Sequence, residues 1–564
     1  RDRSPSRGLG DVYKRQEFTL TAQTENGITV TITGESASLP YPAKEITVTV
    51  TEVTDGERRT IRDQILGEDQ AEPERSYLLD ITLWHGEEEI EPTGSVTVTF
   101  SGIDTEGLYP KVYHIDTDTK TATDMGAKTG ENGDVTIDTN HFSMFEVQAR
   151  SFQPLSGYVG EAFINGGNFK LTGDAWTADN GSSANLSISK DTTIDLNGHT
   201  LKISEAEQYF GVYDGAKLTI MDSQAPEETV SDASGDVYGH VATLNENTLT
   251  YYITESTANG TGTKETLKKH EVPLNAAGKI LCGEASAQAI LVKATLELQS
   301  GVLQNTGGQH IVTVDGGTLD VNGGYIVGGG SDDKPGGGIY VDNGTVNIQR
   351  GVIAANRGRS GGGIYVSRGT LNISGGAVAG NEVINGHSDN GGGIYVNSGT
   401  LNLSGGYVTN NYKECGCNDC RNDVNNTHGG GGIALANSSA MNMTGGYVTG
   451  NYSGLAGGGI YAGFFGHNVR FTMSGGTIAG NCAELGEGGG LRIAGGTNGV
   501  IQATNKVYIT NNITNSNNDW GGGGIFVQDK GNLNITNALI TDNTAGGYGA
   551  VSYTHLRAHE TDSY

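Results

Sequence analysis

Three cysteines and one histidine form the cluster of side chains best suited to bind a metal or to cross-link. Cys415, Cys417 and Cys420 are followed, eight residues after the last, by His428. Three thiolates and an imidazole could complete a tetrahedral zinc site. Zinc sites usually contain two separated cysteine pairs, and exported proteins more often join such cysteines in a disulfide. We expect a disulfide, with Cys415–Cys420 sterically easier than a bridge between nearer cysteines; free thiols and a metal site are the alternatives.

A column of aromatic residues is the second candidate. A form of Gly-Gly-Gly-Ile-Tyr-Val occurs seven times between Gly336 and Val527, and the residue after its isoleucine or leucine points away from the apolar side of the strand. These residues are Tyr340, Tyr365, Tyr395, Ala434, Tyr461, Arg492 and Phe526. If successive copies stack ~4.8 Å apart, the rings form an exposed strip for sugar rings, with tyrosine hydroxyls as hydrogen-bonding partners. The structural alternative is that aromatic residues simply favour strands.

Loops of different length precede the Gly-Gly-Gly runs and are rich in acidic and aromatic side chains. The acidic ones are Glu382, Asp389, Glu414, Asp419, Asp423, Glu484, Glu487 and Asp519, and the aromatic ones are Tyr412, Tyr452 and Trp520. Because every copy leaves the same corner of the repeat, the loops should gather on one side, where repeat proteins often bind their partners. Such a rim suits glycan or protein contact. No cofactor is expected, although these carboxylates could bind calcium.

The same repeat predicts the elements that position these residues. One unit of 25 residues, from Ile339 to Ile364, contains three short strands with alternating apolar and polar residues between glycine-rich turns. A period of two, with β-branched residues on one side, is the strand signal. Three strands per turn predict an all-β, right-handed, single-stranded parallel β-helix with continuous columns of inward isoleucine, valine and leucine.

An asparagine follows the inward residue of each third strand by three positions. These residues are Asn356, Asn381, Asn411, Asn451, Asn481, Asn512 and Asn543. Asparagine tolerates left-handed backbone angles and hydrogen-bonds its own turn. Amides stacked in register can also bond to one another along the helix axis. We therefore predict a structural asparagine ladder.

Residues 17–150 have a different pattern. Segments such as Ile28–Ile32, Ile46–Val50 and Val96–Phe100 alternate threonine with valine or isoleucine, which suits a β-sandwich of seven or eight strands. The region contains no cysteine. It resembles the Ig-like modules that precede repeat regions in surface proteins of gut Firmicutes, and this resemblance implies a spacer. Residues 151–156 are predicted to be a linker.

Residues 157–550 resemble the right-handed parallel β-helix, or pectin-lyase-like, superfamily. Thr192–Leu201 is similar to an early coil of its members, and the glycine-rich repeats are most similar to those of bacterial surface adhesins and polymorphic membrane proteins. A charged segment at about 222–279 is predicted to be an insertion such as a lateral hairpin. The superfamily includes polysaccharide lyases and polygalacturonases as well as non-enzymatic adhesins, so fold alone does not decide activity.

Both ends of the sequence differ from the rest. Residues 1–16 and 551–564 resemble the translated sequencing adapters found at the edges of metagenomic gene fragments, and we treat them as non-native tails. A signal peptide and a cell-wall attachment are then expected in regions outside this sequence.

Composition and charge narrow the function classes. Glycine accounts for 90 of 564 residues, far above the roughly 7% of ordinary proteins, and serves turns. A net charge of −29 argues against a nucleic-acid partner. No run approaches the ~18 apolar residues of a membrane-spanning helix. No catalytic residues are predicted, because the outward residues of the second strand are threonine and asparagine, where a glycosidase needs paired carboxylates.

We therefore predict a non-catalytic, secreted or cell-surface, adhesin-like stalk that contacts glycans or host or partner proteins through the aromatic column and the loops. The alternative is a carbohydrate-active enzyme, either a polysaccharide lyase or a glycoside hydrolase. Its catalytic carboxylates would lie on the early coils or on the insertion. Two or three carboxylates within about 5–10 Å in one groove would favour the enzyme.

Overall fold

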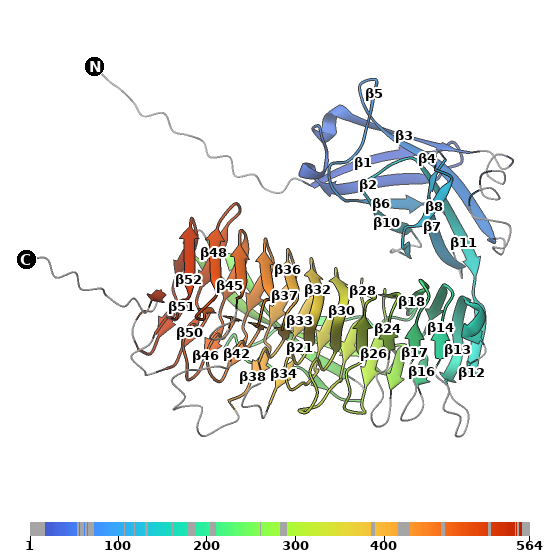
Figure 1. Ribbon diagram of the computed structural model, residues 1–564. Coiled ribbons are helices and arrows are strands. Elements are labelled where there is room, and N and C mark those ends of the chain that lie inside the picture. Colours follow the sequence, from blue (N-terminus) through green and yellow to red (C-terminus); the bar gives the residue numbers. More distant parts are fainter. Residues whose placement is uncertain are drawn as a thin grey trace, which may run out of the picture. The chain divides into compact units, whose positions relative to one another are not determined.

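The computed structural model describes residues 17–554 apart from 54–55, 57–60, 62–64, 66–72, 106–107, 118, 130–133, 161, 178–185, 204–209, 247, 260, 283–289, 385–389, 416–428, 464–467, 517–520, 529, 548 and 550–551. The regular secondary structure of these residues is almost entirely strand, with only short 3-10 turns beside it, as the alternating patterns predicted. The chain divides into two compact units, which contain residues 1–153 and residues 154–564 (Figure 1). None of the helices in the described part has the length and apolar character needed to cross a membrane.

The first unit is a β-sandwich of two antiparallel sheets. One has the order β1-β2-β6-β10-β9 and the other β3-β4-β11-β7-β8, with β5 paired to β4. Buried Val98 and Phe100 share one core with Phe145 of the facing sheet, and the two phenylalanine ring centroids lie 6.4 Å apart. The elements are β1 (Glu17–Gln23), β2 (Thr29–Glu35), η1 (Ser36–Ser38), η2 (Ala43–Glu45), β3 (Ile46–Glu52), β4 (Arg75–His85), β5 (Glu88–Ile90), β6 (Val96–Ser101), β7 (Leu108–Asp116), β8 (Thr121–Asp124), β9 (Lys128–Thr129), β10 (Val135–Thr139) and β11 (Met144–Ser151).

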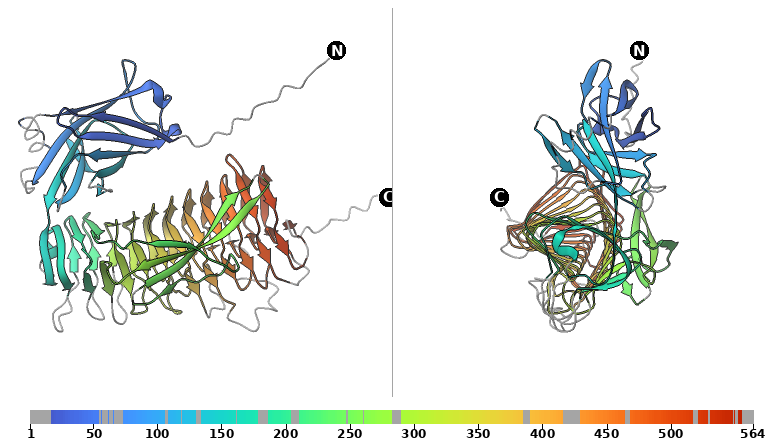
Figure 2. Two further views of the ribbon diagram at one scale, coloured as in Figure 1. Left: turned by 180° about the vertical axis from the view of Figure 1, so that it is seen from behind. Right: turned by 90° about the vertical axis from the view of Figure 1, so that its right-hand side faces the viewer.

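The second unit is a parallel β-helix in which 34 strands of the described residues form one hydrogen-bonded series (Figure 2). Each strand pairs in register with the equivalent strand of the next coil. In β30 (Ile339–Ile348) and β32 (Ile364–Ile373), Tyr340 is opposite Tyr365 and Asn347 is opposite Asn372. The predicted class, antiparallel sheets followed by a stacked parallel β-helix, is confirmed.

Three strand positions recur in each coil. The first position contains β14 (Leu186–Ile188), β17 (Phe210–Val212), β24 (Ile290–Val292), β27 (Val312–Asp315), β35 (Ile394–Val396), β39 (Ile433–Leu435), β43 (Ile460–Ala462), β47 (Leu491–Ile493), β51 (Ile525–Val527) and β55 (Ser552–Thr554). The second contains β15 (Thr192–Asp195), β18 (Lys217–Met221), β25 (Thr295–Leu298), β28 (Thr318–Val321), β36 (Thr400–Leu403), β40 (Ala440–Met443), β44 (Arg470–Met473), β48 (Asn498–Gln502) and β52 (Asn532–Thr536). β30 and β32 each span both positions.

The third position contains β16 (Thr200–Ile203), β23 (Lys279–Cys282), β26 (Val302–Asn305), β29 (Tyr325–Val327), β31 (Val352–Ala354), β33 (Ala377–Ala379), β37 (Tyr407–Thr409), β41 (Tyr447–Thr449), β45 (Gly476–Ala479), β49 (Val507–Thr510) and β53 (Leu539–Thr541). The inward residues of all three positions form one continuous core. Before the coils come β12 (Gln153–Tyr158), η4 (Ala162–Asn165) and β13 (Gly167–Trp176). Residues 151–156, which we predicted to be a linker, therefore include the end of β11 and most of β12.

The Gly-Gly-Gly runs lie where neighbouring coils approach closely. A Cβ atom on Gly337 would lie 2.4 Å from the carbonyl oxygens of Arg357 and Gly362, and one on Gly338 would lie 3.0 Å from the side-chain amide of Asn356. A side chain here would displace the backbone or the asparagine. The glycines thus allow the asparagine side chains to pack against the following strand.

The loops that precede the Gly-Gly-Gly runs add a fourth strand position at one corner. It is a six-stranded parallel sheet of two-residue strands. These are β34 (Glu382–Val383), β38 (Tyr412–Lys413), β42 (Tyr452–Ser453), β46 (Cys482–Ala483), β50 (Ile513–Thr514) and β54 (Thr544–Ala545).

The segment predicted as an insertion folds into a four-stranded antiparallel sheet of order β19-β22-β21-β20. Its strands are β19 (Thr229–Asp232), β20 (Thr243–Leu244), β21 (Thr248–Ala258) and β22 (Thr263–Pro273). The β21–β22 hairpin crosses the strands on one flank of the β-helix obliquely (Figure 2). Its buried Leu249 and Val272 pack against outward residues of the third strand position, among them Val327, Ala354 and Ala379.

Candidate functional site

The predicted asparagines stack as a buried inner ladder along the β-helix axis. The side-chain amide of each donates to the Oδ1 of the next at 2.9–3.0 Å. Asn451, for example, donates its second N–H to the carbonyl of Val408 at 2.9 Å. Its Oδ1 accepts the backbone N–H and the side-chain amide of Asn411, both at 3.0 Å. Because these amides are buried and saturated with internal hydrogen bonds, their role is structural.

A second, outer ladder runs along the outward side of the second strand position and was not predicted. Its members are Asp320, Asn347, Asn372, Asn402, Asn442 and Thr472. Each side-chain amide donates to the side chain of the preceding coil at 2.7–2.9 Å, and the series ends on the carboxylate of Asp320. These side chains are half-buried or exposed, so water competes for the same bonds. The recurring outward asparagine was the available sequence signal.

Tyr340, Tyr365 and Tyr395 of the predicted aromatic column are half-buried and stack on one another. Their successive centroids are 5.4 and 5.2 Å apart, with interplanar angles of 6° and 31°. His310, which was not predicted, extends the stack, with its centroid 5.4 Å from that of Tyr340. The near-parallel rings of Tyr340 and Tyr365 cover each other's faces, and the ring of Tyr395 packs at a tilt against Tyr365. A sugar ring cannot stack between them, so the column offers ring edges and hydroxyls instead.

The C-terminal part of the column is buried, which corrects the prediction of an exposed strip. Tyr461 is 1% exposed and Phe526 is 2% exposed, and Arg492 between them is fully buried. The Arg492 guanidinium lies 4.9 and 5.6 Å from the two ring centroids and 3.5 Å from the carboxylate of Glu487. Glu487, predicted for the solvated rim, is itself buried, as is Ala456 beside Tyr461. The loops fold over this part of the column.

The loops bring acidic and aromatic side chains together at the corner of the β-helix. We define the corner surface by these half-buried residues: Tyr238, Asp332, Arg357, Glu382, Tyr412, Glu414, Tyr452 and Glu484. Glu382, Tyr412 and Tyr452 occupy equivalent places in β34, β38 and β42. Tyr238 belongs to the insertion, so no local sequence signal placed it here.

The tyrosines of the corner surface form a near-parallel stack. The ring centroids of Tyr412 and Tyr452 are 4.9 Å apart with an interplanar angle of 8°. Tyr238 lies 6.4 Å from Tyr452 at 14°. As in the first column, the rings protect each other's faces. The stack is therefore a rigid row of phenol groups.

Burial and neighbouring carboxylates raise the pKa of the phenols in this row. Burial and the neighbouring Glu414 raise the pKa of Tyr412, and burial and Glu484 raise that of Tyr452. Burial raises the pKa of Glu382 against the opposing charge of Arg357. At neutral pH the corner surface consequently combines hydroxyl donors with carboxylate acceptors.

Among the eight residues that define the corner surface, Arg357 is the one with a positive charge. Its guanidinium forms a bidentate pair with Asp332, with one Nη2–Oδ2 distance of 2.6 Å, and lies 3.8 Å from Glu382. The corner surface thus has four carboxylates and one guanidinium, which leaves it acidic.

The cysteine cluster is described only in part. Cys415 is half-buried and lies beside Gly454, where a Cβ atom would meet its backbone nitrogen at 2.5 Å. Cys417, Cys420 and His428 lie outside the described residues, as does Trp520. The disulfide, free-thiol and zinc alternatives remain predictions. Within the described part, no three His, Cys, Asp or Glu side chains are placed to hold a metal ion together.

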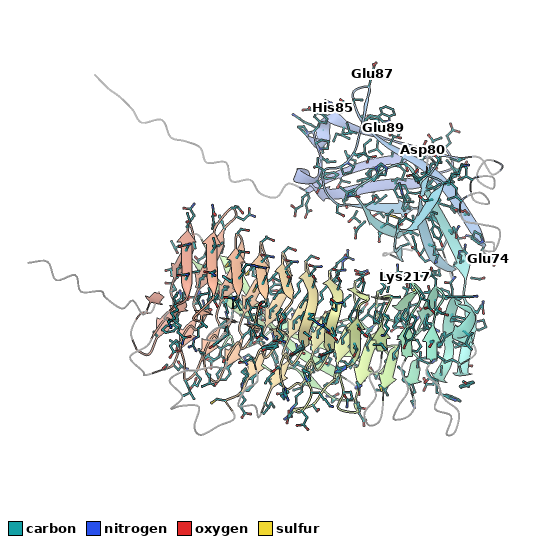
Figure 3. All side chains as sticks on the ribbon, in the orientation of Figure 1. Glu74, Asp80, His85, Glu87, Glu89 and Lys217 are labelled. Atoms are coloured by element: carbon teal, nitrogen blue, oxygen red, sulfur yellow. The ribbon has the colours of Figure 1, made fainter. Side chains whose placement is uncertain are left out.

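Carboxylates of the early coils and of the insertion bind nearby protein groups. Asp195 accepts the backbone N–H groups of residues 197 and 223 and lies 3.2 Å from Lys170. Asp222 accepts backbone N–H groups of residues 198, 224 and 278. Glu297 pairs with Lys217, which Figure 3 labels, at 3.0 Å. Glu228 of the insertion accepts hydrogen bonds from Tyr251 and His270. These acids stabilise turns and neighbouring coils.

The sandwich unit carries its own group of acidic residues on the β4–β5 hairpin, where Figure 3 labels Asp80, Glu87 and Glu89. Burial and the nearby Glu89 raise the pKa of Asp80. His85 stacks on Tyr41 with centroids 3.8 Å apart. This hairpin adds negative charge but gathers no second aromatic row like that of the corner surface.

Comparison with known proteins adds no relative to this description. The chain matches no protein-family model, no curated protein and no solved structure.

Proposed function

We propose that this chain belongs to a secreted or cell-surface, non-catalytic, adhesin-like protein whose β-helix contacts glycans or partner proteins. The contact region is the corner surface, and the Ig-like sandwich is a spacer. One observation carries the proposal: stacked Tyr412 and Tyr452 present their hydroxyls beside the carboxylates of Glu414 and Glu484.

Chemical complementarity favours a neutral glycan as the ligand. Sugar hydroxyls both donate and accept hydrogen bonds, and the corner surface supplies phenol hydroxyls as donors and carboxylate oxygens as acceptors. Its acidic side chains, in a chain of net charge −29, repel polyanions such as nucleic acid and acidic polysaccharides. A basic protein surface is the second partner that this charge would attract.

Rigidity supports the same assignment. The stacked rings and the short parallel strands beneath them fix the hydroxyls before a ligand arrives. Preorganisation lowers the entropy lost on binding. Among the described early-coil carboxylates, Asp195, Asp222 and Glu297 are engaged by backbone amides and lysines, which argues against catalysis there. The carboxylates around Arg357 on the corner surface are the group that a carbohydrate-active enzyme could use instead.

The test compares two sets of variants that keep every ring. The corner variant combines Tyr412→Phe, Tyr452→Phe and Glu484→Gln. The matched control is Tyr407→Phe with Tyr447→Phe, because these half-buried tyrosines also stack, at 4.8 Å and 13°, in the third strand position. Binding is measured on arrays of neutral and acidic glycans. We expect the corner variant to bind its neutral glycan at least tenfold more weakly, since each lost hydrogen bond contributes about 0.5–1.5 kcal/mol.

The control variant should bind within twofold of the original protein. Equal binding by the two variants, or binding confined to acidic glycans, would contradict the proposal. Each polysaccharide is also incubated with the original protein and assayed for new reducing or unsaturated ends. Turnover in that assay would establish the enzyme alternative.

A further inference from the structure

Repeat proteins with stacked coils usually lack contacts between distant coils. Each coil touches only its neighbours, so stability is a sum of local terms and the ends can open one coil at a time. In this protein the segment 223–277, which we call the strap, is an exception. It contains β19 to β22 and contacts coils far along the axis.

The strap begins and ends at one coil. Its two ends meet where the backbone N–H of Gly278 donates to the carboxylate of Asp222 at 2.6 Å. From this root, its apolar residues pack on the third strand position from Val302 to Ala379. Most of the outward residues there are valine or alanine, which allows a second layer to lie close against the coils.

The middle of the strap is held by hydrogen bonds at two further coils. The backbone N–H of Thr254 donates to the hydroxyl of Thr409 at 3.1 Å, and the Thr449 hydroxyl donates to the Thr254 carbonyl at 2.6 Å. Asn410, whose φ is +52°, directs its side-chain amide to the Thr254 hydroxyl at 2.9 Å. These bonds join residues more than 150 positions apart in the sequence.

The tip of the strap is fixed near the last described coils. Asn511, with φ +56°, donates to the Thr263 carbonyl at 2.9 Å and to the Glu265 carboxylate at 2.6 Å. The hydroxyls of Thr263 and Thr510 also hydrogen-bond. A Cβ atom on Gly262 would lie 2.9 Å from the carboxylate of Asp542. An 11-residue strand such as β21 is about 35 Å long, the height of about seven coils at ~4.8 Å.

We propose that the strap is a clamp that makes the β-helix open as one cooperative unit rather than coil by coil from its C-terminal end. Opening of the coil that contains β49 must break the Asn511 and Thr510 bonds to the strap as well as the contacts between neighbouring coils. Release of the strap tip in turn loosens Thr254, which is bonded to two earlier coils. The clamp also fixes Tyr238 beside Tyr452, so it stabilises one ring of the corner surface.

Hydrogen exchange followed by mass spectrometry tests the clamp strand by strand. The variant Asn511→Gly keeps the left-handed backbone, which glycine adopts freely, and removes only the side-chain bonds to the strap. The matched control is Asn537→Gly, because Asn537 has φ +60° in the following coil and is exposed. We expect Asn511→Gly to speed exchange at least tenfold in β49 to β53 and to leave β25 to β28 unchanged. The control should change exchange less than twofold.

A second variant replaces the strap by a short Gly-Ser linker, which the proximity of Asp222 and Gly278 permits. Faster exchange should then extend from β31 to β53. Unchanged protection of β49 to β53 in both variants would overturn the proposal, as would an equal effect of Asn537→Gly. If the strap-less chain fails to fold, Asn511→Gly alone decides.

Discussion

Replacement of Asn451 by alanine should destabilise the β-helix by about 4 kcal/mol. Asn451 accepts the backbone N–H and the side-chain amide of Asn411, so its loss leaves two buried donors without acceptors. Each stranded donor costs about 1–3 kcal/mol. The lost side-chain bonds to Val408 and Asn481 add to this effect. The Oδ1 of Asn481 still accepts the backbone N–H of residue 451, which the substitution does not remove.

The matched control is Asn442→Ala in the same coil. Asn442 belongs to the outer ladder, is exposed, and shares hydrogen bonds with Asn402 and Thr472 that water can replace. We expect a cost below about 1 kcal/mol. Urea unfolding followed by far-ultraviolet circular dichroism measures both changes, and hydrogen exchange of β41 and β45 shows where the coils open. Equal shifts of the unfolding midpoint in the two variants would refute the reasoning that burial gives the inner ladder its strength.

Two further predictions concern buried ionisable side chains. Burial, with nearby Lys334, lowers the pKa of His310 to about 4, so the unfolded chain takes up a proton between pH 6.5 and 4 that the folded chain does not. Stability present above pH 6.5 should therefore fall by about 3 kcal/mol as the pH approaches 4, and His310→Phe should remove this part of the pH dependence of the urea midpoint. Arg492→Met leaves the Glu487 carboxylate buried without its cation and should cost about 3–5 kcal/mol. In thermal melts, addition of Glu487→Gln should recover much of that loss; no recovery would count against the ion pair.

The inner columns of the β-helix could be predicted because the residue pattern within each short strand is enough to identify them. Isoleucine and valine alternate with polar residues within each strand, and one copy of the repeat predicts the next. The asparagine positions were equally regular, and their stacking followed from coils in register. The structure also shows hydrogen bonds from the Nδ2 of each of these asparagines to a carbonyl of the preceding coil, such as Asn451 to Val408, which were not predicted.

The burial of Tyr461, Arg492 and Phe526 could not be predicted from alternation. A period of two tells which side of the strand a residue faces, but not whether a loop covers that side. A signal was present, since an arginine between two aromatic positions and a glutamate five residues earlier suit a covered cation. The prediction treated each as a separate solvent-exposed residue.

The position of the strap was beyond local sequence reasoning. Charge and a break in the repeat predicted an insertion, but its bonds to Thr409 and Asn511 span about 150 to 250 residues. The indirect signal is the run of alanine and threonine at the outward end of the third strand, where Ala354, Ala379 and Thr409 leave room for a second layer. The full set of residues on the corner surface could not be predicted from local sequence either, because Tyr238 reaches this surface only as part of the strap.

The two amide ladders point in opposite directions. In the inner ladder, the amide-to-amide bonds run toward later coils, as from Asn356 to Asn381, whereas in the outer ladder they run toward earlier coils, as from Asn372 to Asn347. Hydrogen-bonded amides in a row polarise one another and build up an axial dipole. Two opposed rows partly offset each other, so lengthening the stack by duplicated repeats accumulates less electrostatic penalty at its ends. Evolution can then vary the reach of such a rod by gene duplication alone.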